Sequence, residues 1–255
     1  FNAITNSHVE AANYPFATIN PNVGTVAVPD KKVEDLVKLF NPKRTIFTAF
    51  EFVDIAGLVK GASKGEGLGN QFLSHIREVE AIVHVVRCFE DENITHVEGS
   101  IDPIRDISII DLELILADLD TLNKRITKTE KAAKGDRGLQ KELELLLLLR
   151  ETLESEKPIR SLQFDDPDTQ KLVKSYQLLT SKPVLYAANI AEEDIGQEDS
   201  NQHLNKICDF AKDQEAQVIW ICGKIESELL ELSLEEKALF LEELGIEASG
   251  LDRLI

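Results

Sequence analysis

The stretch TIFTAFEFVDIAG, residues 45–57, decides the fold class of this chain. Its first nine residues are rich in β-branched and aromatic side chains, and they predict a strand that ends next to Asp54. Several glycines follow, and residues 68–80 then place apolar side chains at helical spacing. The order of strand, glycine-rich loop and helix predicts one unit of an α/β fold.

Three later runs of apolar residues, at 81–86, 183–188 and 218–222, are nearly continuous. Such runs are typical of strands that are buried on both faces of a parallel sheet. The second and third runs are each followed by polar residues and then by a helical pattern. Strands that alternate with helices predict an α/β fold with a doubly wound, mostly parallel sheet and helices on both sides.

Residues 102–155 interrupt this alternation, because they show helical periodicity alone. A first apolar stripe ends before the sequence KGDRG at residues 134–138, and a second stripe follows it. Two helices joined by a turn that contains glycine predict an antiparallel helical hairpin. We therefore expect an inserted helical domain at residues 102–182 and a discontinuous α/β domain at residues 1–101 and 183–255.

The charge balance limits the possible partners. The chain has 28 Lys and Arg residues against 46 Asp and Glu residues, which gives a formal net charge of −18. This balance argues against a protein that coats nucleic acid along its whole surface, but it allows a local basic patch. The tip of the expected hairpin is either such a patch or an ordinary solvated helix end. Its basic residues are Lys124, Arg125, Lys128, Lys131, Lys134 and Arg137.

The rest of the composition predicts a soluble protein of a reducing compartment. No apolar run approaches the roughly 18 residues that cross a bilayer, and the chain does not start with a signal segment. The three cysteines are odd in number and widely spaced, which argues against a disulfide framework or a zinc site. We therefore expect a cytoplasmic protein.

Asp54 and Gly57 form a D-x-x-G pattern at the end of a predicted strand. In nucleotide-hydrolysing α/β domains, a carboxylate at this place holds the Mg²⁺ shell, and the glycine N–H approaches the γ-phosphate. The loop at residues 13–24 adds Thr18, whose hydroxyl is a candidate Mg²⁺ ligand. Because D-x-x-G also occurs in ordinary turns, the pattern alone leaves both interpretations open.

Longer motifs carry a closer resemblance. NYPFATINPNVG (13–24), DIAG (54–57) and GEGLGN (65–70) resemble the Obg-related GTPases, and VVRCF (85–89) and NITHV (93–97) resemble their YchF branch, the Obg-like ATPases. The resemblance extends over nearly the whole chain and includes the helical hairpin. It implies a P-loop NTPase that hydrolyses ATP with Mg²⁺. It also implies the ribosome as partner, especially the large subunit, with rRNA or tRNA as candidates at the hairpin tip.

The resemblance also concerns the two ends of the sequence. In this family a strand and a G-x-x-x-x-G-K-S-T-L phosphate-binding loop directly precede the residues that match 1–5. A ubiquitin-like TGS domain follows the residues that match the end. Neither segment is among these 255 residues. The resemblance therefore implies a piece of a longer protein that, by itself, binds nucleotide poorly and is weak or inactive in hydrolysis.

The base-recognition segment departs from the GTPase pattern. Where GTPases have Asn-Lys-x-Asp, this chain has Asn189, Ile190 and Glu192. Guanine specificity depends on two hydrogen bonds that the Asp accepts, and the YchF branch is similar in this departure and prefers ATP. We expect Asn189 and Ile190 to contact the nucleotide together with Glu192, and Lys224 to cover the base or ribose. In the alternative interpretation, Asn189 only caps the end of a strand.

The expected catalytic group also differs from the Ras pattern. Leu58 occupies the position at which Ras-type enzymes have the glutamine that orients the attacking water. Leucine cannot form a hydrogen bond with water, and the resemblance implies that His96 takes this role through its imidazole. His96 is otherwise a surface residue of its loop. His75 and His84 are expected to be structural.

Three functions remain open from the sequence. The first is a ribosome-associated, Mg²⁺-dependent ATPase of the YchF type. The second is an Obg-type GTPase, and the third is a non-catalytic switch that binds the ribosome or RNA and uses nucleotide only to set its shape. Competition between ATP and GTP separates the first two, and a turnover assay with and without ribosomes separates the third.

Overall fold

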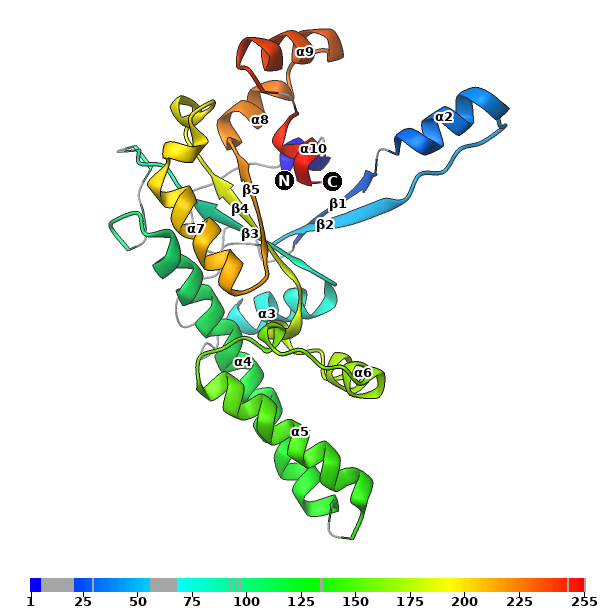
Figure 1. Cartoon of the computed structure of the whole chain (residues 1–255), viewed down its shortest axis with the longest axis vertical. Helices are drawn as coiled ribbons and strands as arrows, with labels where there is room; N and C mark the ends of the chain where they lie inside the picture. Colours follow the sequence, from blue (N-terminus) through cyan, green and yellow to red (C-terminus); the bar gives the residue numbers. More distant parts are fainter. Residues whose placement is uncertain are drawn as a thin grey trace.

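The computed structural model describes residues 1–5, 21–28, 30–55, 68–91, 93–94, 96, 98–133, 135–246 and 248–254 (Figure 1). Thr18, Gly57 and Leu58 lie outside the described residues, as does Lys134 of the hairpin tip. The short elements of the described part are α1 (Asn2–Thr5), η2 (Ile159–Ser161), η3 (Leu179–Ser181), η4 (Glu192–Asp194), η5 (Glu198–Ser200), α9 (Leu234–Glu243) and α10 (Gly250–Leu254).

A three-stranded parallel sheet runs through the centre of the fold. Its strands are β3 (Ile82–Arg87), β4 (Val184–Asn189) and β5 (Gln217–Ile221), in the order β3-β4-β5. Ile82 pairs with Val184, and Leu185 pairs with Gln217. The strands lie within one residue of the predicted runs, and the predicted α/β fold with a parallel sheet is confirmed.

Two helices, α4 (Pro103–Ala132) and α7 (Gln202–Asp213), cover one face of this sheet (Figure 1). Ile107 of α4 and Ile207 of α7 are fully buried there against Tyr186 of β4. Helix α3 (Leu68–Glu78) packs beside α4 through Leu73. The carboxyl ends of the strands remain uncovered by these helices, which is the edge at which ligands bind in open α/β sheets.

A separate antiparallel pair of strands precedes the parallel sheet. Strands β1 (Asn22–Ala27) and β2 (Ala49–Asp54) pair from Asn22 with Asp54 to Ala27 with Ala49. The expected loop at residues 13–24 is therefore wrong for residues 22–24, which belong to β1. The predicted strand at 45–53 begins later, at Ala49.

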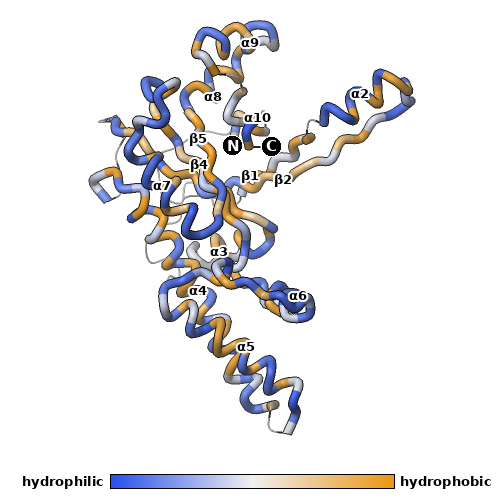
Figure 2. Tube along the Cα trace, viewed as in Figure 1, coloured by the Kyte–Doolittle hydropathy of each residue, from blue (hydrophilic) through white to orange (hydrophobic). Residues whose placement is uncertain are grey.

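Helix α2 (Lys31–Phe40) connects β1 and β2 and projects away from the sheet (Figure 1). Asp30 caps it by accepting the N–H groups of Lys32 and Val33. None of its residues is buried, although hydrophobic and hydrophilic residues alternate along it in Figure 2. This helix therefore contributes little burial to the described fold.

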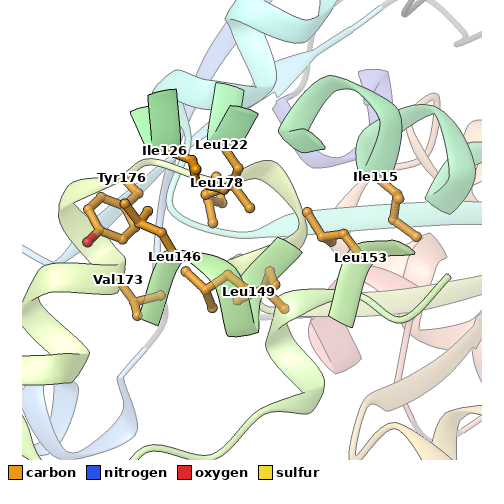
Figure 3. Packing of buried hydrophobic residues seen from close by; sticks show 10 residues of the cluster. Ile115, Leu122, Ile126, Leu146, Leu149, Leu153, Val173, Tyr176 and Leu178 are labelled. Atoms are coloured by element: carbon orange, nitrogen blue, oxygen red, sulfur yellow. The ribbon is translucent and has the colours of Figure 1, made fainter. Parts of the chain in front are cut away.

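The predicted helical hairpin is formed by α4 and α5 (Arg137–Glu154). Asp102 caps α4, with Pro103 at its first turn, and Asp136 caps α5. Both are ordinary signals for a helix start. Gly135 has a φ of +98° in the connection, a conformation that favours glycine. The hairpin has a core of its own (Figure 3), formed by Ile115, Leu122, Ile126, Leu146, Leu149, Leu153, Ile159, Val173, Tyr176 and Leu178.

A buried carboxylate joins α4 to the segment that leads into β4. Asp118 accepts the N–H groups of Leu179 (2.9 Å) and Thr180 (2.8 Å) and the hydroxyl of Thr180 (2.7 Å). Burial raises the pKa of Asp118 above its ordinary value. The hydrogen bonds act in the opposite direction, but their effect is smaller than that of burial. Helix α4 is thus fixed to the sheet region at its middle, before it enters the hairpin, and α6 (Pro167–Ser175) lies in the returning segment.

Charged side chains recur along α4 and α5, the two described helices with at least 18 residues. Within the described residues, no helix combines the length and the apolarity that a membrane span requires.

Candidate nucleotide-binding and catalytic site

Two loops meet at the carboxyl ends of β4 and β5. Asn189 is the last residue of β4, and its Oδ1 accepts the N–H of Gly223, 2.9 Å away, at the start of α8 (Gly223–Leu229). The N–H of Ile190 donates to the carbonyl of Ile221 at 2.8 Å. The sequence placed base recognition on these two loops, and the structure brings them together as one unit.

Glu192 and Lys224 form an ion pair across the same two loops. Both side chains are exposed, and the contact with Glu192 raises the pKa of the Lys224 ammonium. Because solvent screens an exposed pair, its contribution to folding is small. Its effect is to hold the Lys224 ammonium at the rim formed by the two loops.

The side chain of Ile190 lies in the core of the sheet region. Its side chain is 2% exposed and packs in the core beneath the sheet with Val86 and Cys88. The inward alternation of Tyr186 and Ala188 continues to Ile190, because alternate residues of a strand lie on one face. The Ile190 side chain is therefore a core residue in this structure, and a contact between Ile190 and a nucleotide stays a prediction.

Asp54 ends β2 and is half-buried. It lines a broad cavity of about 1910 Å³ together with His96, Phe1 and residues of β2 and β3. Within the described residues, no group of three or more metal-ligating side chains exists. A lone carboxylate still fits Mg²⁺, because this ion is commonly held by one or two carboxylates, water and substrate phosphates.

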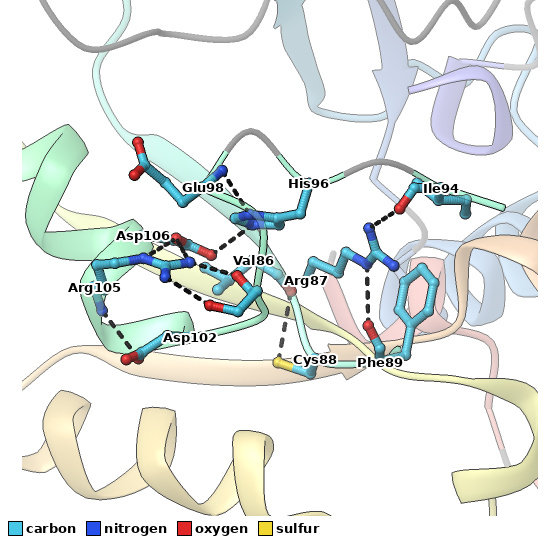
Figure 4. A network of polar contacts seen from close by, with 11 residues as sticks. Val86, Arg87, Cys88, Phe89, Ile94, His96, Glu98, Asp102, Arg105 and Asp106 are labelled. Carbon is cyan, nitrogen blue, oxygen red and sulfur yellow. Dashed lines mark hydrogen bonds and ion pairs between the residues drawn. The ribbon is translucent and has the colours of Figure 1, made fainter. Parts of the chain in front are cut away.

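His96 is fixed on the first turn of α4 (Figure 4). Its Nε2 lies 3.0 Å from Oδ2 of Asp106, and its Nδ1 accepts the N–H of Glu98 at 3.1 Å. The N–H of Gly99 also donates to the carbonyl of His96 at 3.1 Å. His96 is therefore a largely buried, hydrogen-bonded group, in contrast to the alternative of a free surface residue.

Arg87 braces the loop that leads from β3 to His96. Its guanidinium donates to the carbonyls of Phe89, Asp91 and Ile94 at 3.0–3.2 Å, and it lies over the Phe89 ring (Figure 4). No role for Arg87 or Asp106 was predicted from the sequence. A signal for Arg87 was present in the motif VVRCF, but Asp106 resembles any acidic residue in the first turn of a helix.

His84, one of the two histidines expected to be structural, lies within the central sheet. Burial lowers the pKa of His84, which lies on β3. The centroid of the His84 ring lies 5.9 Å from that of the Tyr186 ring, within the sheet region. His84 is thus a neutral packing residue, and the prediction of a structural role fits its position.

The hairpin tip carries fewer free cations than its sequence indicates. Arg125 pairs with Glu142 at 3.0 Å and lies 4.1 Å over the Tyr176 ring. Lys124 pairs with Asp120 one turn earlier. Arg125 therefore belongs to the packing of the hairpin. The exposed members of the patch are Lys124, Lys128, Lys131 and Arg137.

Comparisons with known proteins all match this chain to one group of ribosome-binding proteins. A family model described as "50S ribosome-binding GTPase" matches residues 1–190. The chain is 59% identical to "Ribosome-binding ATPase YchF" of Bacillus subtilis, over all of this chain and 70% of that protein. It is 45% identical to the protein of the same name in Escherichia coli O157:H7, over all of this chain and 69% of that protein.

A solved structure gives the same result. It is described as "Structure of the Schizosaccharomyces pombe YchF GTPase", and it matches 99% of this chain and 69% of its own chain with a TM-score of 0.81 and 36% identity. The family model, the relatives and the solved structure thus agree with the motifs at residues 85–89 and 93–97. The chain belongs to the YchF family of ribosome-binding nucleotide hydrolases.

Proposed function

We propose that this chain is the nucleotide-hydrolysing part of a ribosome-associated ATPase. In the reaction, the oxygen of a water molecule bonds to the γ-phosphorus and the bond from that phosphorus to the β,γ-bridging oxygen breaks. The products are ADP, phosphate and a proton. The names of the Bacillus and Escherichia relatives support ATP as substrate and the ribosome as partner.

One observation carries the choice of ATP: the Glu192 carboxylate is paired with Lys224. A guanine-reading carboxylate must accept two hydrogen bonds from the base, and adenine has no such pair of donors. The Oδ1 of Asn189 is used by Gly223, so its Nδ2 is the group that would donate to an acceptor on the base. Lys224 would then cover the base or ribose.

Mg²⁺ would be held mainly by the nucleotide phosphates. Asp54 would hold the ion through water, with Thr18 as a direct ligand and the Gly57 N–H at the γ-phosphate. The bound ion would neutralise charge that develops on the transferred phosphoryl group. His96 would orient the attacking water, as the family resemblance implies.

We further propose that the 255 residues alone hydrolyse ATP weakly, because the nucleotide side of the described fold leaves apolar side chains open. The two sheets support this proposal, because β2 and β3 pair only with β1 and β4 among the described strands and line one cavity with Phe1. Val85 of β3 is 61% exposed and Phe50 of β2 is 55% exposed. These side chains lie on sheet faces, so further chain packed on those faces would cover them.

The proposed domains are a discontinuous α/β unit at 1–101 and 183–255 and a helical insert at 102–182. Because α4 packs on the sheet through Ile107 and on α5 through Leu122, the two units would move as connected parts. The exposed cations of the hairpin tip are the proposed contact with rRNA of the large subunit or with tRNA. A cytoplasmic location follows from a ribosomal partner.

A GTPase is the second candidate. The matching family model and the solved Schizosaccharomyces structure both carry the name GTPase. A third candidate, a non-catalytic switch on the ribosome, would bind nucleotide without turnover.

The test is competition of ATP and GTP for one labelled nucleotide analogue on the full-length protein, followed by turnover with and without ribosomes. Stronger competition by ATP together with turnover supports the ATPase. Stronger competition by GTP supports the second candidate, and tight binding without turnover in either condition supports the third.

A further inference from the structure

The contact between His96 and Asp106 fixes which nitrogen of the histidine carries the proton. The backbone N–H of Glu98 donates to Nδ1 of His96 at 3.1 Å, so Nδ1 is the nitrogen with the lone pair. The proton of the neutral ring is then on Nε2, which donates to Oδ2 of Asp106 at 3.0 Å. Asp106 thereby stabilises one tautomer of the ring.

Asp106 is itself held on its other oxygen. Nε and Nη2 of Arg105 donate to Oδ1 at 3.1 Å and 2.9 Å. The same guanidinium donates to the hydroxyl and the carbonyl of Ser100, which belongs to the loop that carries His96 (Figure 4). The carboxylate therefore has one oxygen assigned to Arg105 and the other to His96.

The rigid support of this arrangement is the first turn of α4. Asp106 lies four residues after the N-cap Asp102, and Ile107 beside it is fully buried against the sheet. A group on a packed helix is placed more accurately than a group on a loop. His96, in contrast, lies on a loop, so its orientation depends on the partner that α4 provides.

We propose that Asp106 is a positioning residue that holds His96 as the Nε2–H tautomer and leaves Nδ1 to accept a hydrogen bond from the attacking water. This inference rests on the proposed function of His96. In the structure the N–H of Glu98 donates to Nδ1, and the attacking water would replace it as the donor.

The decisive variant is Asp106→Asn. Arg105 donates to Oδ1, so the amide oxygen of the new side chain would occupy that position and its NH₂ group would face Nε2 of His96. An NH₂ donor requires a lone pair on Nε2, which moves the ring proton to Nδ1 and breaks the hydrogen bond that Nδ1 accepts from the Glu98 N–H. The same change in a serine protease triad leaves the geometry intact but gives the wrong tautomer.

The expected result in the full-length protein is a fall in kcat of about 10- to 100-fold with little change in KM for ATP. Asp102→Asn is the matched control, because it removes the same charge from the same turn and Asn caps helices as well as Asp does. It should leave kcat unchanged. The imidazole ¹⁵N shifts of histidine-labelled protein should show protonated Nε2 in the parent and protonated Nδ1 in Asp106→Asn.

A double variant separates positioning from folding. If Asp106 acts through His96, Asp106→Asn should have no further effect on kcat in a His96→Ala background. Full turnover by His96→Ala alone would contradict the proposed function of His96, and this inference with it. A normal tautomer in Asp106→Asn, or losses of kcat that multiply in the double variant, would overturn the inference alone.

Discussion

The helical hairpin and the facing edges of β2 and β3 are both rich in apolar side chains, but only the hairpin buries them. Leu149 of α5 is 0% exposed, whereas Val85 of β3 is more than half exposed. The partners of α5 are the preceding helix and the segment at residues 159–178, so the core of the hairpin is completed within the insert at residues 102–182. The edges of β2 and β3 have no paired strand among the described residues. Among the described residues, therefore, apolar side chains are covered in the hairpin and left open on β2 and β3.

The largest expected effect tests this contrast directly. Leu149→Ala removes a fully buried side chain and should lower the free energy of unfolding by about 2–5 kcal/mol. Val85→Ala is the matched control on β3 and should change it by less than about 0.5 kcal/mol. Urea denaturation of the 255-residue chain measures both. Equal losses would show that Val85 is buried in solution and that the sheet edge is covered.

The next effect concerns the carboxylate that joins α4 to the segment before β4. Asp118→Ala leaves two buried N–H groups, those of Leu179 and Thr180, without an acceptor. We expect a loss of about 1–3 kcal/mol in the free energy of unfolding at neutral pH. An unchanged free energy of unfolding at pH 7 would contradict the assigned hydrogen bonds.

The pH dependence of Asp118 has a definite sign. Burial raises its pKa in the folded state, so the folded protein binds this proton more tightly than the unfolded chain does. The contribution to stability is full below the unfolded pKa of about 4 and is lost as pH rises toward the folded pKa. Asp118→Asn cannot titrate. Its free energy of unfolding relative to that of the parent should therefore increase as pH rises through that range. If the difference between the two proteins is the same at every pH, the raised pKa of Asp118 is contradicted.

Sequence patterns predicted those parts of the fold whose signals are local. Apolar runs located β3, β4 and β5 within one residue, and the two stripes of leucines located α4 and α5. Strand β1 was missed because Gly24 weakens its pattern and prolines adjoin it in the sequence. Its strand conformation depends on pairing with β2, which lies more than twenty residues away.

The candidate site was predictable in its residue types and less so in its contacts. Asn189, Glu192 and Lys224 come together as two joined loops, as the resemblance indicated. Ile190 was assigned to the nucleotide because it stands at the Lys position of the GTPase pattern, and the alternation from Tyr186 places its side chain in the core. Asp106 could not be identified, because it reaches His96 only through the path of the loop between them.

Smaller effects are expected at the hairpin tip, where one set of substitutions should change ribosome binding alone and another should change stability. Lys128→Ala with Lys131→Ala removes two exposed cations and should weaken ribosome binding, with a reduced salt dependence, while thermal stability stays unchanged. Arg125→Ala should instead lower thermal stability, because Arg125 contacts Glu142 and the Tyr176 ring. Sedimentation with ribosomes and thermal melts measure the two properties. Unchanged binding by the lysine variant would remove the tip from the proposed interface.

The smallest expected effect on folding is at the nucleotide side, at the pair of Glu192 and Lys224. Lys224→Ala breaks an exposed ion pair whose Coulomb energy is screened, so the urea midpoint should not change measurably. ATP affinity should nevertheless fall about tenfold, because the ammonium at the rim of the two loops would no longer cover the bound nucleotide. The loss should be similar for ATP and GTP, since Lys224 would contact the shared ribose side of either ligand. Glu193→Gln is the matched control: it removes a neighbouring exposed carboxylate and leaves the pair of Glu192 and Lys224 intact, so ATP affinity should be retained. If Lys224→Ala lowers the midpoint as much as Leu149→Ala does, the pair is a folding contact, and the nucleotide side is as complete as the hairpin.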